Sequence, residues 1–223
     1  MYSKHLSNYE KVRNSNRLVV CFSGFAGHYE RGRYNYVRSL SKSKSDRLFI
    51  RDDFGFRGVG TYYLGDSCTL YKHSTIQNLI RTMQKPSVSE TVFVGSSKGG
   101  SAALLYGLMM GADRIIIGSP QYRIGDYLHE NDYHREILNC IVDRSNGFDE
   151  NWLNGLIDFA LDEKPYTGEI TLIYSSKEGG YQEDTIPLIN TLKARSIRLN
   201  LHDELFEDHS QVGRYFTKYL SEL

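Results

Sequence analysis

Short apolar runs recur along this 223-residue chain, and each is followed by a glycine-rich or polar stretch. The runs are rich in β-branched, aromatic and leucine residues, which is typical of strands buried on both faces of a parallel sheet. The predicted strands are residues 17–22, 47–51, 91–95, 114–118, 169–174 and 196–201. Helical patterns lie between them, at residues 34–43, 74–84, 98–110, 184–194 and 209–222. This alternation predicts right-handed βαβ units and a doubly wound, mostly parallel α/β sheet of about six strands.

The interval 119–168 interrupts the alternation because it is too long for a simple connection. It contains segments with a helical pattern, at residues 132–142 and 150–161. We interpret the interval as one helix that continues the fold plus a small helical cap. Since the chain shows no repeats, low-complexity stretches or linkers, we expect residues 1–223 to form one domain with this cap inserted in it.

The composition argues against several classes of partner. Acidic and basic residues balance at 27 each, so nothing indicates nucleic acid or an anionic membrane surface. The first 16 residues lack the apolar core of a secretory signal, and no apolar run approaches the roughly 20 residues that span a bilayer. The expected location is therefore the cytoplasm. Three unclustered cysteines, Cys21, Cys68 and Cys140, predict neither a disulfide framework nor a metal site.

The sequence Gly95-Ser96-Ser97-Lys98-Gly99 lies between a predicted strand and a predicted helix. In that context it fits G-x-S-x-G, in which the central serine occupies a strained turn and presents its hydroxyl at the top of the sheet. The glycines are expected because backbone and helix pack too closely there for side chains. The alternative is a glycine-rich joint without catalysis. A phosphate-binding loop does not fit, because the lysine precedes the glycine pair.

A nucleophilic serine needs a base, and the base needs an acid that orients it. The expected order along the chain is serine, acid, histidine. His209 follows the last predicted strand and is the first candidate for the base, with His202 as the second. For the acid, Glu178 follows the fifth strand; Asp184 is the alternative, although it could instead cap the next helix.

An acyl-transfer intermediate also needs N–H donors for its oxyanion. The N–H of Lys98, at the start of the helix, is one candidate donor. The second is the N–H of Phe25 or Gly24, in the loop after the first strand.

Several side chains near the strand ends are candidates for substrate binding, although rim charges and packing aromatics would give the same pattern. Arg123, and also the side chain of Lys98, could hold an anionic sugar or the phosphates of a donor. The substrate-binding candidates are Arg51, Asp53, Tyr62, Tyr63 and Arg123.

The strand–GSSKGG–helix joint, a later acid and a histidine after the last strand together resemble the α/β-hydrolase fold from Arg17 onward. On this resemblance, the extra N-terminal strands of that fold are absent. The stretches RDDFGFRGVGTYYLG, VFVGSSKGGSAALLYG and IIIGSPQYRIGDYL look like bacterial capsular-polysaccharide biosynthesis proteins of hydrolase fold, a group that includes capsule O-acetyltransferases. They are also similar to hydrolase-like accessory secretion proteins that modify glycans on serine-rich adhesins.

The resemblance implies Ser97 as the nucleophile, His209 as the base, an acid near Glu178 and a carbohydrate acceptor. A glutamate in place of the commoner aspartate departs from the family pattern. The implied reaction is polysaccharide O-acetylation with acetyl-CoA as a co-substrate and with no bound cofactor. Two alternatives stay open, a carbohydrate esterase with the same triad and a non-catalytic glycan-binding or assembly module. The 17 tyrosines suit a sugar ligand.

Overall fold

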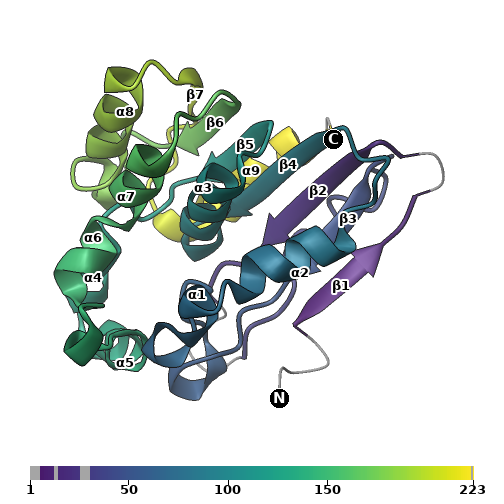
Figure 1. The fold of residues 1–223 in the computed structure, drawn as a ribbon. Helices are drawn as coiled ribbons and strands as arrows, with labels where there is room; N and C mark the ends of the chain where they lie inside the picture. Colours follow the sequence, from purple (N-terminus) through teal and green to yellow (C-terminus); the bar gives the residue numbers. More distant parts are fainter. Residues whose placement is uncertain (1–5, 13–14, 26–30, 222) are drawn as a thin grey trace.

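The computed structural model describes residues 6–12, 15–25, 31–221 and 223. Within them, seven strands form one sheet in the order β1-β3-β2-β4-β5-β6-β7 (Figure 1). β1 runs antiparallel to β3, and the other neighbouring strands are parallel. The strands are β1 (Ser7–Glu10), β2 (Arg17–Phe22), β3 (Asp46–Ile50), β4 (Glu90–Ser96), β5 (Arg114–Gly118), β6 (Glu169–Tyr174) and β7 (Arg198–Asp203).

The doubly wound parallel sheet predicted from the apolar runs is confirmed, with all six predicted strands in it. The expectation that no strand precedes Arg17 is wrong, because β1 forms the edge of the sheet beside β3. β1 is a four-residue strand with half-buried or exposed side chains, so it lacks the apolar pattern that identifies the other strands.

The helices of the described residues lie between the strands and after the last one. None of them combines the length and the apolar character that crossing a bilayer requires. The predicted helices at 74–84, 98–110 and 184–194 correspond to α2, α3 and α8, and residues 209–222 contain η5 and α9. The α-helices are α1 (Thr69–Lys72), α2 (Thr75–Met83), α3 (Lys98–Met110), α4 (Ile124–His129), α5 (Asp132–Ile141), α6 (Glu150–Asn154), α7 (Leu156–Glu163), α8 (Thr185–Ala194) and α9 (Val212–Leu220). The 3-10 helices are η1 (Phe56–Gly58), η2 (Asp66–Cys68), η3 (Arg144–Asn146), η4 (Gly179–Tyr181) and η5 (His209–Gln211).

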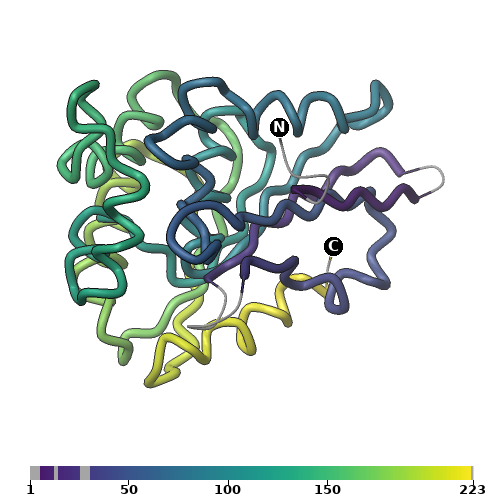
Figure 2. Tube along the Cα trace, turned by 90° about the horizontal axis from the view of Figure 1, so that it is seen from below, coloured from purple at the N-terminus to yellow at the C-terminus, as the bar shows by residue number. Residues whose placement is uncertain are grey.

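The predicted helix at 34–43 is wrong, because this segment forms successive turns. Only one helical hydrogen bond closes in it, from the Leu40 N–H to the Tyr36 carbonyl at 2.9 Å, before three-residue turns take over. Tyr36 has a φ of +60°, which a right-handed helix cannot accommodate. The segment lies beside α9 on one face of the sheet (Figure 2).

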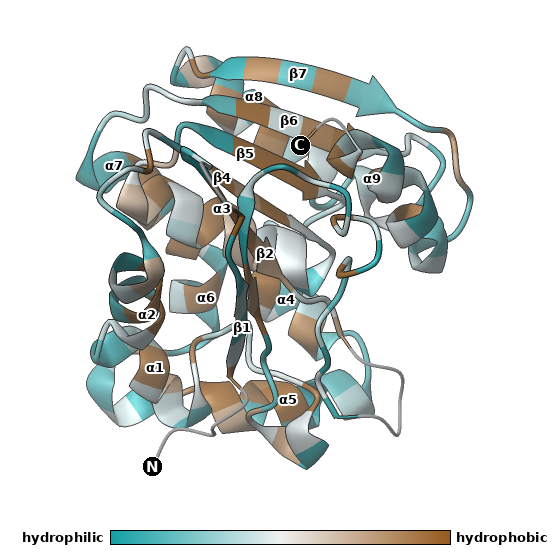
Figure 3. Cartoon of the chain, turned by 90° about the vertical axis from the view of Figure 1, so that its right-hand side faces the viewer, coloured by the Kyte–Doolittle hydropathy of each residue, from teal (hydrophilic) through white to brown (hydrophobic). Residues whose placement is uncertain are grey.

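Side chains that alternate along the strands bury two cores, one on each face of the sheet. In β2, Leu18, Val20 and Phe22 face a large core that α2, α3, α7 and α8 cover. Val19 and Cys21 face a smaller core under α9 and the turns at 34–43. The central strands are accordingly apolar along their length, whereas the edge strand β7 alternates with polar residues (Figure 3). Burial on both faces fixes the parallel strands, so their carboxyl ends meet at one edge of the sheet.

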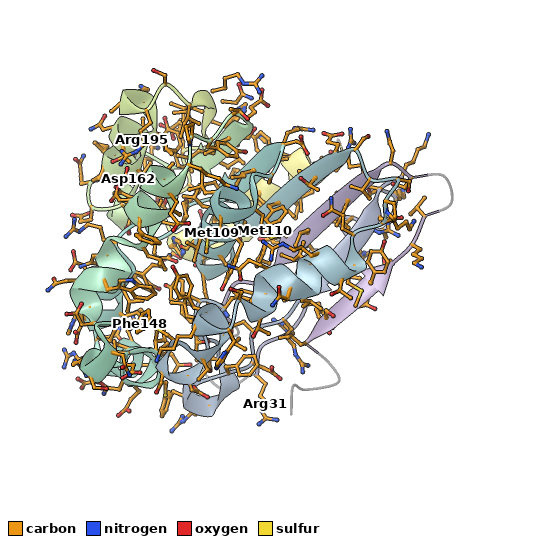
Figure 4. All side chains as sticks on the ribbon, viewed as in Figure 1. Arg31, Met109, Met110, Phe148, Asp162 and Arg195 are labelled. Carbon is orange, nitrogen blue, oxygen red and sulfur yellow. The ribbon has the colours of Figure 1, made fainter. Side chains whose placement is uncertain are left out.

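The interval 119–168 is largely helical and contains α4, α5, α6 and α7. α7 packs against α3 and so extends the helical layer of the large core. α4, α5 and α6 lie together to one side, near α1 (Figure 1). An aromatic cluster joins them to α1: the Trp152 ring lies 4.7 Å from that of Phe148 and 5.1 Å from that of Tyr71. Phe148 is labelled in Figure 4. Whether α4–α6 act as a cap stays a prediction.

Candidate active site

Ser97 occupies the sharp joint between β4 and α3. Its φ is +52° and its ψ is −131°, a conformation that costs a residue with a side chain about 1–3 kcal/mol. Backbone hydrogen bonds maintain it, because the Ser97 N–H donates to the Gly118 carbonyl at 2.8 Å and the Ser97 carbonyl accepts the Ser101 N–H at 3.0 Å. These hydrogen bonds therefore hold Ser97 in the strained conformation, with its hydroxyl beyond the end of the sheet.

The glycines on either side of the joint are required by close packing, as predicted from the sequence. A Cβ on Gly95 would lie 2.2 Å from the Gly99 carbonyl oxygen. A Cβ on Gly99 would lie 2.5 Å from the Phe22 carbonyl oxygen, on the neighbouring strand β2. Side chains at these positions would push α3 away from the sheet and displace Ser97.

Ser97, His209 and Glu178 form one hydrogen-bonded chain. The Ser97 Oγ lies 2.8 Å from the His209 Nε2, and the His209 Nδ1 lies 3.0 Å from the Glu178 Oε2. Three strands supply these groups, since Ser97 follows β4, Glu178 follows β6 and His209 begins η5 after β7. A serine hydroxyl, an imidazole and a carboxylate in this order can generate a nucleophile.

The acid end of the chain is held by its surroundings. Glu178 is only 5% exposed, and its second carboxylate oxygen accepts a hydrogen bond from the Ser119 hydroxyl. Asp208 accepts the Ser210 N–H at 2.8 Å and so caps η5, which carries His209. The carboxylate and the imidazole are therefore fixed relative to each other before any substrate arrives.

The other candidates for acid and base lie elsewhere. Asp184 accepts the N–H groups of Tyr122 at 2.7 Å and Arg123 at 2.9 Å, so it holds the loop after β5 and does not cap α8 with its side chain. Burial raises the pKa of Asp184, and those two N–H groups oppose the shift. His202 lies on β7 with its ring 4.7 Å from that of Tyr219.

Gln121 is a site residue that the sequence analysis missed. Its Nε2 lies 3.4 Å from both the Ser97 Oγ and the His209 Nε2, and its Oε1 accepts the Tyr62 hydroxyl at 3.3 Å. Gln121 is buried, and Ser101 donates to its carbonyl at 2.8 Å. Its position in the polar stretch after the fourth predicted strand was the available signal.

The predicted oxyanion donors lie on either side of the joint. Lys98 is the first residue of α3, so its N–H has no acceptor within the helix. A Cβ on Gly24 would lie 3.4 Å from the Ser96 carbonyl oxygen, which places the loop after β2 beside the joint. Phe25 follows, with its ring 5.5 Å from that of Tyr62. The roles of Lys98, Gly24 and Phe25 as donors stay a prediction.

The Lys98 side chain does not hold an anionic sugar or a phosphate, contrary to the expectation from the sequence. It is fully buried, and its Nζ lies 2.9 Å from the Asp52 Oδ2. The same oxygen accepts the N–H groups of Thr61 at 2.8 Å and Tyr63 at 3.0 Å. This buried pair ties the loop after β3 to the start of α3.

The predicted substrate-binding residues separate into three groups. Tyr63 is wrong as a substrate contact, because it is fully buried and its hydroxyl donates to the Ile50 carbonyl at 2.9 Å. Tyr62 is also buried and reaches the site only through Gln121. The remaining three are in ion pairs: Arg51 and Asp53 pair with each other at 2.7 Å, and the exposed Arg123 pairs with Asp126 at 2.7 Å.

A cavity of about 380 Å³ opens beside His209. Gln121 and Pro120 line one part of it, and Gly179 and Gly180 line another. Its lining also includes five carboxylate side chains, those of Glu130, Glu178, Asp184, Glu207 and Asp208. Neither here nor elsewhere in the described residues is a group of three or more histidine, cysteine and acidic side chains placed to hold a metal ion.

Comparison with known proteins adds the fold class. No protein-family model matches the sequence, and no curated protein is similar to it in sequence. Solved structures do match. A capsule O-acetyltransferase of Neisseria meningitidis serogroup A, in complex with CoA, superimposes with a TM-score of 0.79 at 22% identity, over 97% of this chain and 89% of that one.

Two further structures match less closely. A glycosylation-associated protein complex from Streptococcus agalactiae gives a TM-score of 0.69 at 18% identity, over 96% of this chain and 43% of that one. A fluorophosphonate-binding serine hydrolase from Staphylococcus aureus gives 0.60 at 15% identity, over 96% and 85%. These likenesses show that the chain has the α/β-hydrolase fold.

Proposed function

We propose that the protein is a serine acyltransferase that O-acetylates a carbohydrate through an acyl-Ser97 intermediate, with acetyl-CoA as the donor. The observation that carries the proposal is the hydrogen-bonded chain from Ser97 through His209 to Glu178. The structural likeness to a capsule O-acetyltransferase, seen there in complex with CoA, supports the choice of acyl group, donor and acceptor.

In the first half of the reaction, the Ser97 Oγ attacks the thioester carbonyl as His209 Nε2 takes the hydroxyl proton. A C–O bond forms, and the carbonyl oxygen becomes an oxyanion facing the N–H of Lys98 and the loop at Gly24 and Phe25. Glu178 stabilises the imidazolium that results. When the oxyanion collapses, the C–S bond breaks, and His209 gives its proton to the departing thiolate.

In the second half, a sugar hydroxyl gives its proton to His209 Nε2 and attacks the acetyl carbonyl. The bond between carbon and Ser97 Oγ breaks, and the proton returns to Ser97. The same steps with water in place of the sugar would make the protein a carbohydrate esterase. The structural likeness to a serine hydrolase supports that alternative, because the fold does not decide between transfer and hydrolysis.

Acceptor-dependent release of CoA tests the proposal. We expect free thiol to appear from acetyl-CoA faster when capsule-type oligosaccharides are present, and the oligosaccharide to gain acetyl groups by mass spectrometry. Robust hydrolysis of aryl acetates without transfer to any of a broad panel of acceptors would replace the transferase with the esterase. Inactivity in both assays, with no covalent labelling, would favour the non-catalytic module.

The acid of the triad can be tested by a matched pair of substitutions. Glu178→Gln is expected to lower kcat for aryl acetate hydrolysis by about 10³- to 10⁴-fold, because the neutral amide no longer stabilises the imidazolium. Asp184→Asn is expected to keep kcat within about tenfold, since an amide oxygen still accepts the N–H groups of Tyr122 and Arg123. The reverse ranking would assign the acid to Asp184.

A further inference from the structure

The lining of the cavity beside His209 is strongly acidic, and this affects which acceptors can bind there. It contains Gln121 and His209, which both contact the Ser97 hydroxyl, so a group bound in it reaches the reacting oxygen. The His209 side chain is 40% exposed, which leaves part of the ring open toward the cavity. The cavity is therefore part of the proposed active site, and its carboxylates determine the charge of what can enter.

Two of the five carboxylates are committed to the protein. Glu178 binds His209, and Asp208 caps η5. The other three retain capacity for a ligand. Asp184 uses Oδ1 for its two backbone partners, while its Oδ2 lies 3.7 Å from where a Cβ on Gly180 would stand. Glu130 and Glu207 are exposed at the rim.

Nothing positive in the described lining offsets these charges apart from histidine. The cavity-lining residues that the structure describes include neither lysine nor arginine. Glu130 lies near His134, with 3.8 Å between the carboxylate and the imidazole Nδ1, and it also interacts electrostatically with His209. Burial raises the pKa of Glu130, and the nearby Asp184 carboxylate raises it further, so the acidic groups repel one another.

The remaining walls suit a hydroxyl-rich ring. Gly179 leaves open space, because no described atom lies within 4 Å of where its Cβ would be. Tyr127 supplies an aromatic face, and its ring lies 4.6 Å from that of His134. Carboxylate oxygens accept hydrogen bonds from sugar hydroxyls, and an aromatic ring packs against the apolar face of a sugar.

Given the proposed acyl transfer, on which this inference rests, we infer that the cavity is the acceptor subsite and that it selects neutral or amine-bearing glycans against carboxylated or phosphorylated ones. A carboxylate or phosphate on the acceptor would lie close to the carboxylates of the cavity. Because the site is partly desolvated, the repulsion between these like charges disfavours binding. By the same argument, the phosphates of acetyl-CoA are expected to lie outside this cavity.

Matched acceptors test the selection. The acyl-enzyme is formed from a neutral aryl acetate, so that the charge of CoA plays no part, and is then offered one methyl glycoside in neutral, amine-bearing and carboxylated forms. We expect the carboxylated form to be acetylated at least tenfold less efficiently, by kcat/KM, than the neutral form. Raising the ionic strength is expected to shrink that ratio.

Substitutions at the rim assign the effect to the cavity. In the double variant Glu130→Gln/Glu207→Gln, the ratio of neutral to carboxylated acceptor is expected to fall at least threefold. The control Glu163→Gln removes one carboxylate charge from the exposed end of α7, outside the cavity lining, and is expected to leave the ratio unchanged. Equal use of the three acceptors, or preference for the carboxylated one, would overturn the inference and leave the proposed acyltransferase standing. Hydrolysis of the acyl-enzyme with no transfer to any form would overturn both.

Discussion

Replacing Ser97 with alanine is expected to reduce acyl turnover by about 10⁴- to 10⁶-fold and to abolish covalent labelling by a fluorophosphonate. The Ser97 Oγ is the atom that lies 2.8 Å from the His209 Nε2, and no other described hydroxyl is placed on that nitrogen. Because the residues of such a triad act as a unit, loss of the nucleophile leaves only the contributions of binding and of the oxyanion donors.

The neighbouring serine provides a matched control. The Ser96 hydroxyl is hydrogen-bonded to the Tyr36 hydroxyl on the other side of the joint and does not contact His209. Ser96→Ala is therefore expected to label with the fluorophosphonate to the same stoichiometry as the wild type. Intact-mass spectrometry measures the added phosphonyl group directly, and circular dichroism shows whether each variant is folded.

Either of two results would contradict the prediction. Labelling that persists in Ser97→Ala would place the reactive group elsewhere. A folded wild-type protein that does not label at all would remove the support for an activated serine, and a glycan-binding or assembly role would then account better for the chain.

The parts of the fold that could be predicted from the sequence are those determined by the local pattern of apolar residues and glycines. Apart from the edge strand β7, each parallel strand is apolar on both faces, so its burial can be inferred from its own residues without knowledge of its neighbours. The joint at Ser97 could also be predicted from the sequence. Close backbone contacts leave no room for a side chain at positions 95 and 99, so glycine is required at both. Ser97, Glu178 and His209 follow the parallel strands β4, β6 and β7, and the sheet brings the ends of these strands together.

What the sequence did not reveal depends on contacts between distant segments. β1 is held by pairing with β3 and by a hydrogen bond from the Tyr9 hydroxyl to Asp46, 37 positions away, at 2.8 Å. The residues at 34–43 have helical composition, but the positive φ of Tyr36 is incompatible with a right-handed helix, so turns form instead. Neither feature is recorded in the local pattern of apolar residues.

Contacts between distant segments also explain why Tyr63 and the side chain of Lys98 do not have their predicted roles in substrate binding. Both follow strand ends and both are polar, so both were predicted to bind substrate. Their burial depends on the path of the loop from Asp52 to Tyr63, which folds back over the start of α3. A loop of that length has many possible paths, and the sequence alone does not choose between them.

Lys98→Met is expected to lower the free energy of unfolding by about 3–5 kcal/mol, because it leaves the Asp52 carboxylate buried without its counter-charge. Both side chains are fully buried, and the ammonium also lies over the rings of Phe25 at 5.2 Å and Tyr63 at 5.3 Å. Burial lowers the pKa of Lys98, and the Asp52 carboxylate opposes that shift. Denaturant unfolding of the wild type and the variant measures the difference.

An exposed lysine pair supplies the control for this substitution. Lys218 lies 2.5 Å from Glu204, but its side chain is 57% exposed, so water screens the pair. Lys218→Met is expected to cost less than about 1 kcal/mol. A similar small cost for Lys98→Met would show that the buried pair is not an electrostatic unit.

A double substitution distinguishes loss of charge balance from loss of packing. Asp52→Asn keeps an oxygen that can accept the N–H groups of Thr61 and Tyr63 while it removes the negative charge. In the Lys98→Met/Asp52→Asn variant neither charge is left unpaired, so we expect the double variant to be more stable than Lys98→Met alone, by at least about 1 kcal/mol. If the two substitutions instead add their separate costs, the carboxylate and the ammonium do not depend on each other, and packing of the lysine chain explains why it is buried at the joint that carries Ser97.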